Sequence, residues 1–269
     1  MPELKPQEFE WLRGVIKRAA GIHLTDGKET VIRARLGKRL RATGCLDFES
    51  YIEQIESDAS GTEMAAMIDA VTVNQTSFFR EPTHFPVLQS VLNTLLERET
   101  AVNVWSAGCA TGEEPYTLAM LADSIVANVQ ERVRFLATDI CSTALAVAQE
   151  GIFPKRALRA IPENFLQYVT PTDSRETRYA IRPDIQRLIS FARLNLIGDW
   201  PMRGPMHIIF CRNVMMYFDS PTQRRLAARF SKLLAPGGYL FIGHSEALSI
   251  GSGLDYIQPA VYQKPEALR

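Results

Sequence analysis

The sequence predicts an α/β fold, in which a mostly parallel sheet with helices on both faces follows an all-α N-terminal domain. Two observations support this prediction. Residues 7–73 carry apolar side chains at helical spacing between glycines, and strand-like and helix-like segments alternate from residue 101 onward. The strands are rich in β-branched residues, as expected for strands buried on both faces. We expect a helical domain over residues 1–75, a linker and connecting helix over 76–100, and an α/β domain over 101–269.

Composition excludes several classes of protein. With 269 residues, 46% of them hydrophobic, the chain can bury one large core or two smaller ones. Its 30 basic and 30 acidic side chains give no indication of a nucleic-acid or membrane partner. No apolar run has the roughly 18 residues that a transmembrane helix needs, and MPELKPQEFEWLRG lacks the apolar core of a signal peptide. We therefore expect a cytoplasmic protein that does not insert into membranes.

The cysteines predict neither a metal site nor disulfides. Cys45, Cys109, Cys141 and Cys211 are far apart in the sequence, without a CxxC pair, and the chain has four histidines to assist them. We expect reduced thiols that pack in the core, and no metal.

Two basic and apolar helices open the N-terminal domain. EFEWLRGVIKRAAG is expected to end at Gly21, and ETVIRARLGKRLRATG at Gly44, because glycine commonly terminates helices. Around the apolar stripe of the second helix lie five cations: Arg33, Arg35, Lys38, Arg39 and Arg41. An acidic helix opened by Asp47 or Ser50 follows, and TEMAAMIDAV is expected to form another.

The next segment, TVNQTSFFREPTHFP, is polar and aromatic, and its two prolines bracket a helix expected to run to about Arg98. We interpret it as the linker between the domains.

The C-terminal part alternates strand and helix. The expected elements are, in order, strand AVNVWSAG, helix EEPYTLAMLADSIVANV, strand RVRFLATDI, helix CSTALAVAQEG, strand MHIIFCRNV, helix SPTQRRLAARFSKLLAPGG ending at its glycine pair, and strand YLFIGHS. Residues 151–193 interrupt the alternation and predict an inserted subdomain. Polar motifs follow three strands (Ala107–Glu114, Thr138–Asp139 and Arg212–Asn213), at the edge where α/β sheets bind ligands.

The turn after the first strand resembles a nucleotide-binding turn, but it carries negative charges where such a turn would bind a negatively charged phosphate. Glu113 and Glu114 stand where a phosphate would otherwise bind. One interpretation is helix capping, since Thr111-x-x-Glu114 fits a capping box. The alternative is a ligand that is cationic and free of phosphate, approaching closely because Gly108, Gly112 and the residues between them are small. S-adenosylmethionine has these properties.

Asp139 supports this ligand. It ends the second strand, where nucleoside-binding folds place an acid on the ribose hydroxyls. The alternative role for Asp139 is as N-cap of the next helix.

Five motifs in this order resemble the CheR-type chemoreceptor glutamate methyltransferases: TVNQTSFFRE (72–81), VWSAGCATGEEPY (104–116), LATDI (136–140), NL (195–196) and FCRNVMMYF (210–218). The resemblance covers nearly the whole chain. It implies a Rossmann-like class I S-adenosylmethionine methyltransferase domain with an inserted small β-subdomain. The implied activity is methyl transfer to glutamates on the cytoplasmic helical bundle of chemoreceptors, leaving S-adenosylhomocysteine.

The resemblance also implies site residues. The implied cofactor contacts are Asn74, Thr76, Arg80, Glu114, Asp139, Asn195, Leu196, Arg212 and Asn213. We expect Arg80 and Tyr217 to position the acceptor carboxylate, since an arginine can hold a carboxylate bidentately. The alternatives are a surface role for Arg80, an N-cap role for Asn213 and a core role for Tyr217. Phe78 and Phe79 fit packing as well as contact with adenine.

Two parts of the chain, the basic helix and the insertion, are relevant to binding of the receptor. The resemblance implies that the basic helix (Arg33, Arg35, Lys38, Arg39 and Arg41) docks on the acidic receptor bundle, although such a helix is more commonly a solvated face. Some family members bind a C-terminal receptor pentapeptide through a glycine-rich segment of the insertion. Here VTPTDSRETRYA contains no glycine, which favours an enzyme that does not need the pentapeptide.

Three other functions fit parts of the pattern. A methyltransferase with another acceptor would share the cofactor, whereas a nicotinamide-dependent dehydrogenase lacks support because GxGxxG is missing. A non-catalytic adaptor that binds S-adenosylmethionine is the third.

Overall fold

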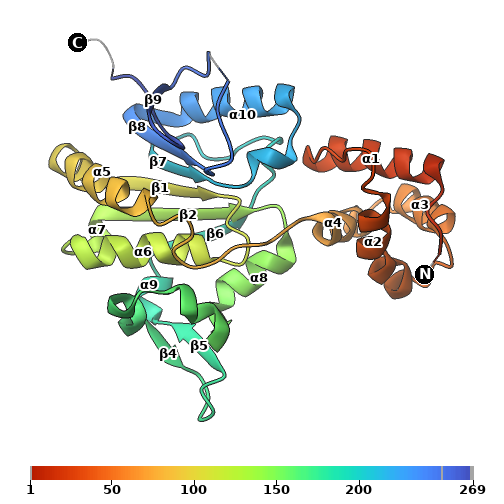
Figure 1. The fold of residues 1–269 in the computed structure, drawn as a ribbon, viewed down its shortest axis with the longest axis horizontal. Helices are drawn as coiled ribbons and strands as arrows, with labels where there is room; N and C mark the ends of the chain where they lie inside the picture. Colours follow the sequence, from red (N-terminus) through yellow and green to blue (C-terminus); the bar gives the residue numbers. More distant parts are fainter. Residues whose placement is uncertain (1, 250, 267–269) are drawn as a thin grey trace. The chain divides into compact units, whose positions relative to one another are not determined.

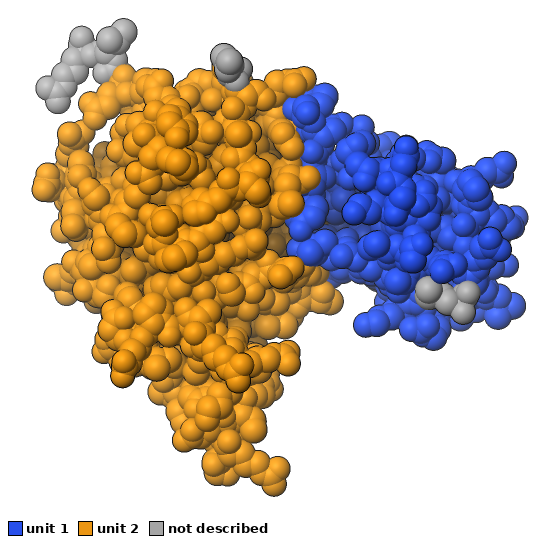
Figure 2. Space-filling view, viewed as in Figure 1, with its two compact units in different colours: residues 1–73, 217–222 blue, residues 74–216, 223–269 orange. Residues whose placement is uncertain are grey.

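The computed structural model describes residues 2–249 and 251–266. The chain forms two compact units (Figures 1 and 2). Unit 1 comprises residues 1–73 and 217–222, and unit 2 comprises residues 74–216 and 223–269. Residues 217–222, expected in the C-terminal domain, group with unit 1 because His23 N donates to Tyr217 O at 2.7 Å and Lys17 pairs with Asp219 at 2.8 Å.

Unit 1 is helical, as predicted. Its helices are α1 (Pro6–Ala20), α2 (Glu29–Thr43), α3 (Phe48–Ser57) and α4 (Thr62–Val71). Gly21 and Gly44 end the first two in the left-handed conformation that lacks a Cβ penalty. Asp47 begins α3 by accepting a hydrogen bond from Ser50 N, which decides between the two expected caps.

Unit 2 is built on a seven-stranded sheet of order β6-β2-β1-β7-β8-β10-β9. The strands are β1 (Val102–Ala107), β2 (Val133–Asp139), β6 (Ile189–Arg193), β7 (Met206–Cys211), β8 (Leu234–Ile242), β9 (Asp255–Gln258) and β10 (Val261–Gln263). Neighbours from β6 to β8 are parallel, whereas β10 is antiparallel to β8 and to β9. The sheet is therefore mixed; the sequence did not lead us to expect the final two strands.

Helices precede the first strand of the main sheet and lie between its later strands. They are α5 (His84–Arg98), α6 (Glu113–Ile125), α7 (Val129–Arg132), α8 (Ser142–Glu150), α9 (Pro183–Gln186) and α10 (Ser220–Leu233), with 3₁₀ turns η1 (Lys155–Ala160), η2 (Glu163–Tyr168) and η3 (Met215–Tyr217). Helix α6 is buried over most of its length, between the sheet and α5 and α9. This burial holds the first residues of α6 rigidly at the sheet edge.

A second, three-stranded sheet forms the insertion, with β5 (Arg178–Ile181) between β3 (Ile152–Pro154) and β4 (Val169–Pro171). The β4–β5 hairpin extends away from the main sheet (Figure 1). The expected limit of 193 for the insertion is wrong, because β6 pairs in parallel with β2 from Phe135–Ile189 to Asp139–Arg193 and belongs to the main sheet.

The expectation that α10 ends at the glycine pair is also wrong. The helix ends at Leu233, and Gly237 and Gly238 lie inside β8. A Cβ on Gly238 would lie 2.9 Å from His207 O of the neighbouring strand, so the glycine permits the close approach of two backbones.

Candidate functional site

The carboxyl ends of the parallel strands form one edge of the main sheet. The strand registers pair Ala107 with Thr138, Asp139 with Arg193, and Cys211 with Ile242, so the loops that follow lie side by side. This confirms the expectation that the polar motifs after three strands meet at one edge.

The turn after β1 is held by backbone hydrogen bonds. Gly108 N and Cys109 N both donate to Thr138 O, at 2.8 and 2.9 Å. Gly108 and Gly112 have φ of 90° and 98°, and a Cβ would meet Val214 Cγ2 at 2.5 Å or Ala148 Cβ at 2.8 Å. The protein's own packing and the left-handed backbone therefore require these glycines, and close approach of a ligand to the turn stays a prediction.

Asp139 is fixed at the mouth of this turn. Its Oδ2 accepts from Ala110 N at 2.8 Å, and its Oδ1 accepts from Cys141 N at 2.9 Å. The N-cap of α8 is Cys141, so the capping alternative for Asp139 is wrong. The Asp139 carboxylate is thus held at the carboxyl end of β2, beside the turn that follows β1.

Glu114 lies beneath the turn in a buried ion pair. Its Oε1 accepts from Ser106 Oγ and its Oε2 from Arg212 Nε, both at 2.7 Å. The capping-box interpretation is wrong: the N-cap is Gly112, and Glu114 reaches across the sheet instead. Glu113 accepts from Thr111 Oγ1 at 2.6 Å, and burial raises the pKa of the Glu113 carboxyl.

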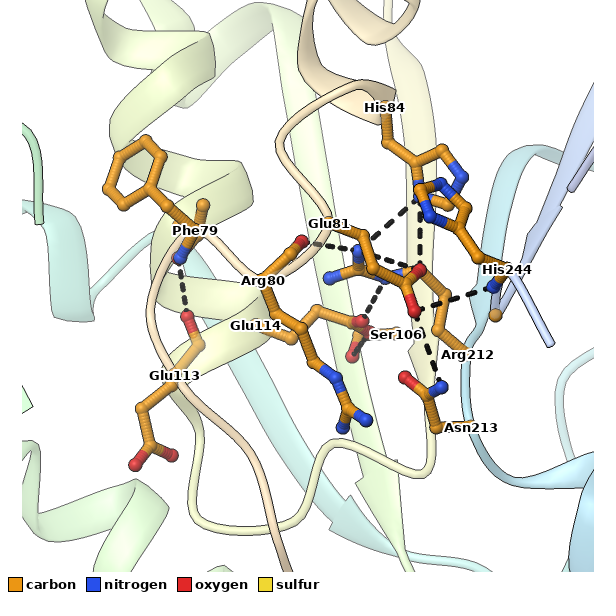
Figure 3. Close-up of polar contacts among 12 residues, drawn as sticks. Phe79, Arg80, Glu81, His84, Ser106, Glu113, Glu114, Arg212, Asn213 and His244 are labelled. Atoms are coloured by element: carbon orange, nitrogen blue, oxygen red, sulfur yellow. Dashed lines mark hydrogen bonds and ion pairs between the residues drawn. The ribbon is translucent and has the colours of Figure 1, made fainter. Parts of the chain in front are cut away.

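Arg212 is the centre of a buried charged cluster (Figure 3). Besides Glu114 it donates to Arg80 O at 2.6 Å, and its guanidinium lies 3.6 Å from Glu81 Oε2 and 3.3 Å from His84 Nδ1. Burial, and then the positive charge of Arg212, lower the pKa of His84 to about 4. His84 is therefore neutral at pH 7, and the positive charge of Arg212 is balanced by the carboxylates of Glu81 and Glu114.

The same cluster contains potential metal ligands. Glu81, His84 and His244 place one potential ligand atom each within 4.8 Å of one another. The Arg212 guanidinium already brings a positive charge to within 3.6 Å of Glu81 and 3.3 Å of His84, so a second cation there would be repelled. The absence of a metal stays a prediction.

Asn213, directly after Arg212, has a left-handed backbone with φ of 58°. Its Nδ2 donates to Glu81 Oε1 at 3.3 Å and its backbone N donates to Glu246 Oε2 at 2.9 Å. Its Oδ1 is buried and accepts no hydrogen bond from any described residue, which does not fit the N-cap alternative and leaves an acceptor for a ligand.

The linker contributes Asn74, Thr76 and Arg80. Asn74 Nδ2 lies 3.1 Å from Cys141 Sγ, Thr76 is half-buried, and Arg80 donates to Gln75 O at 3.0 Å. Phe79 and Glu81 have φ of 50° and 56°, a conformation that such residues adopt only under constraint.

The aromatic pair of the linker packs within unit 2. The ring centroid of Phe78 lies 4.9 Å from that of Phe153, and that of Phe79 lies 4.8 Å from that of Phe165. The packing interpretation is therefore confirmed for both phenylalanines.

The other predicted residues lie in three places. Asn195 and Leu196 follow β6; Asn195 Oδ1 accepts from Ile197 N at 3.2 Å, and Leu196 is buried. Tyr217 is half-buried and belongs to unit 1. All four cysteines are free, and burial raises the pKa of Cys109 and Cys211, as their packing role requires.

The basic side chains of helix α2 differ in their contacts and exposure. Arg39 pairs with Glu63, which also accepts from Tyr51 at 2.6 Å, and Arg35 donates to Val71 O and Thr72 O. Lys38 and Arg41 are exposed, and Arg33 is half-buried.

Four residues of this site were not expected from the sequence: Glu81, His84, His244 and Glu246. Charged and histidine side chains directly after Arg80 (REPTH), and directly after an apolar strand (GHSE), were the signal that could have indicated them.

Comparison with known proteins shows which protein family the chain matches. Residues 74–258 match the family model described as the CheR methyltransferase SAM-binding domain, and residues 7–72 match the CheR all-alpha domain. The chain belongs to the CheR methyltransferase family. It is an S-adenosylmethionine-dependent methyltransferase of the chemotaxis type.

Several curated relatives are similar over most of the chain. A chemotaxis protein methyltransferase of Borreliella burgdorferi is 34% identical, covering 96% of this chain and 94% of the relative. A probable chemotaxis protein methyltransferase of Rhizobium etli is 38% identical (86% and 88%). The chemotaxis protein methyltransferase of Escherichia coli strain K12 is 37% identical (91% and 86%). Across the described residues, every helix is too short or too polar to cross a membrane.

Proposed function

We propose that the protein transfers a methyl group from S-adenosylmethionine to glutamate side chains of chemoreceptor cytoplasmic domains, forming glutamyl methyl esters. Membership of the CheR family over both of its domains carries this proposal. The reaction would take place in the cytoplasm, on the helical bundle of the receptor, without nucleic acid or insertion into the membrane.

The described residues fit the cofactor by their chemistry. Buried Asn213 Oδ1 and Glu81 Oε2 accept no hydrogen bond from described residues, and the Asp139 carboxylate lies at the end of β2. Acceptors of this kind suit the hydroxyl and ammonium groups of S-adenosylmethionine and would repel a pyrophosphate. We propose that the cofactor is held by Asn74, Thr76, Arg80, Glu114, Asp139, Asn195, Leu196, Arg212 and Asn213.

The cofactor supplies the methyl group on a sulfonium sulfur. The acceptor glutamate, with a reference pKa of about 4.3, is already ionised at neutral pH, so the chain needs no strong general base. Its task is alignment, for which oriented intramolecular systems gain up to about 7–11 kcal/mol. In this proposal Arg80 and Tyr217 position the acceptor carboxylate, and the acidic residues orient the cofactor.

Labelled methyl transfer to membranes that contain chemoreceptors, followed by base treatment, tests the function. Base-labile label on the receptor is the expected result, because methyl esters hydrolyse in base. Cofactor binding without transfer would contradict the proposal and favour another acceptor or a non-catalytic adaptor.

Variants of Arg80 and Tyr217 test the assignment of roles. With cofactor saturating, Arg80→Ala and Tyr217→Phe should each lower kcat at least about tenfold, as expected when a group that aligns the reactants is removed. Arg98→Ala and Tyr256→Phe are matched controls on exposed residues. Near-normal turnover by both test variants would refute the assignment.

A further inference from the structure

Glu246, in the loop after β8, binds three backbone amides with one carboxylate. Its Oε2 accepts from Gly243 N at 2.7 Å and from Asn213 N at 2.9 Å, and its Oε1 accepts from Met216 N at 3.0 Å. The side chain thereby connects the loop after β8 to the loop after β7. Hydrogen bonds to an ionised acceptor are about twice as strong as neutral ones.

The residue that Glu246 holds has a left-handed backbone. Asn213 has φ of 58°, in the left-handed region that asparagine tolerates better than most residues with a side chain, and its neighbours fix it there. Two carboxylates do so here: Glu246 binds its backbone N, and Glu81 accepts from its side-chain Nδ2. With Nδ2 engaged, the amide oxygen is left as the buried acceptor without a described partner.

Gly243 permits this arrangement. A Cβ at this position would lie 2.6 Å from Asn213 Nδ2, 2.9 Å from Asn213 N and 2.9 Å from Glu246 Oε2. Real Cβ atoms essentially never come so close, so a side chain here would displace Asn213 or Glu246. The orientation of the Asn213 side-chain amide is therefore constrained by the φ of Asn213, by the three amide contacts of Glu246 and by Gly243.

We propose that Glu246 is a positioning residue of the methyltransferase, which holds the Asn213 amide oriented toward the cofactor. The inference rests on the proposed function, in which Asn213 contacts the cofactor. Glu246 itself acts through the Asn213 amide, whose position it fixes by binding the backbone of the two loops. Its ionised carboxylate is essential, because an amide at this position would direct an NH₂ group at one or two of the three N–H donors.

The experiment measures binding of S-adenosylhomocysteine by calorimetry to four proteins: wild type, Glu246→Gln, Asn213→Gly, and the double variant. Glycine is chosen at position 213 because it tolerates the left-handed backbone while removing the amide. Glu266→Gln is the matched control; this exposed carboxylate pairs with Arg98 at the end of α5. Thermal unfolding of each protein separates loss of fold from loss of positioning.

We expect Glu246→Gln to raise Kd at least tenfold, with the control within twofold of wild type. In the Asn213→Gly background the same change should alter Kd less than twofold, because two residues that act through one contact are not additive. Gly243→Ala disturbs the contact from the other side and should also raise Kd, which provides a second test if Glu246→Gln is unstable.

Two results would overturn the positioning role while wild type still binds. One is an unchanged Kd in Glu246→Gln, and the other is the same fold-change in both backgrounds. Failure of wild type to bind S-adenosylhomocysteine would instead overturn the proposed cofactor site, and the inference with it.

Discussion

At the scale of single residues, the site depends on one buried arginine and the groups around it. Arg212 is 2% exposed at its side chain and is paired with Glu114, which is 10% exposed. Removing one member of such a pair typically costs about 3–5 kcal/mol, because the other charge remains buried. His84 contacts the same guanidinium and must stay neutral to do so.

His84 therefore predicts a loss of stability in acid. Its pKa is about 4 in the folded protein against an ordinary 6.5, so the unfolded chain takes up the proton first. The free energy of unfolding should be unaffected by this group above pH 6.5 and should decrease between pH 6.5 and 4, by at most about 3 kcal/mol. The charged and titratable groups that face His84 are Arg212, Glu81 and His244.

Urea unfolding of wild type and His84→Gln between pH 4 and 7.5 measures this loss. The difference in unfolding free energy between the two proteins isolates His84 from other titrating groups. We expect wild type to lose stability relative to the His84→Gln variant as the pH falls. A difference independent of pH would show that His84 does not titrate as its burial implies.

At the scale of elements, helix α2 divides its cations between folding and a free surface. Arg39 Nε lies 3.0 Å from Glu63 Oε1 and so connects α2 to α4, while Lys38 and Arg41 face solvent. The sequence suggested five equivalent receptor-docking candidates. The structure shows that Arg39 and Arg35 already make contacts within unit 1.

This division predicts two different phenotypes. Arg39→Ala should lower the free energy of unfolding by about 1–3 kcal/mol, since Glu63 is largely buried and loses its charged donor. Lys38→Ala with Arg41→Ala should leave stability within about 0.5 kcal/mol of wild type, as is usual at exposed sites. The double variant should instead weaken binding to the receptor bundle, and should reduce the dependence of that binding on salt.

Chemical denaturation and receptor binding at two salt concentrations measure both effects. Receptor binding that is indifferent to salt in wild type would exclude electrostatic docking through α2. Equal destabilisation by the two variants would exclude the division of roles.

At the scale of the whole molecule, the insertion is where the resemblance leads us to expect a choice between two modes of receptor recognition. Its β4–β5 hairpin turns through residues 172–177, where Thr177 Oγ1 donates to Asp173 Oδ2 at 2.6 Å and Glu176 N donates to Asp173 O at 3.1 Å. The turn is thus held by its own side-chain and backbone hydrogen bonds, without glycine. We propose that the enzyme recognises the receptor bundle and does not depend on a C-terminal pentapeptide.

Calorimetric titration of the enzyme with such a pentapeptide tests this proposal. We expect no heat of binding with the peptide at about 100 μM, well above the micromolar range in which a dedicated tether site would saturate. Receptors with and without the five C-terminal residues should be methylated at equal rates. Micromolar affinity, or slower methylation of the truncated receptor, would contradict the proposal.

Hydrophobic periodicity, glycine placement and polar residues after strands are local signals, so the sequence by itself determined the helices of unit 1, the parallel strands and the edge that carries the site. Asp139, Arg212 and Asn213 were found because they lie at the end of a strand or in the two positions after it, and the direction of the strand fixes where these positions emerge. The pairing of strands could not be predicted from such local signals. Whether β6 joins the main sheet, or whether Gly237 and Gly238 end a helix or lie in a strand, depends on neighbours far away in sequence.

Only the tertiary structure decided what the charged groups contact. Glu114 resembled a helix cap in its local context, yet it pairs with Arg212, 98 residues later in the chain. Glu246 lies 33 residues after Asn213 and holds its backbone. The physical reason is that a buried charge takes whichever opposite charge or backbone amide the fold brings within 3 Å, and no periodicity in the sequence records that distance.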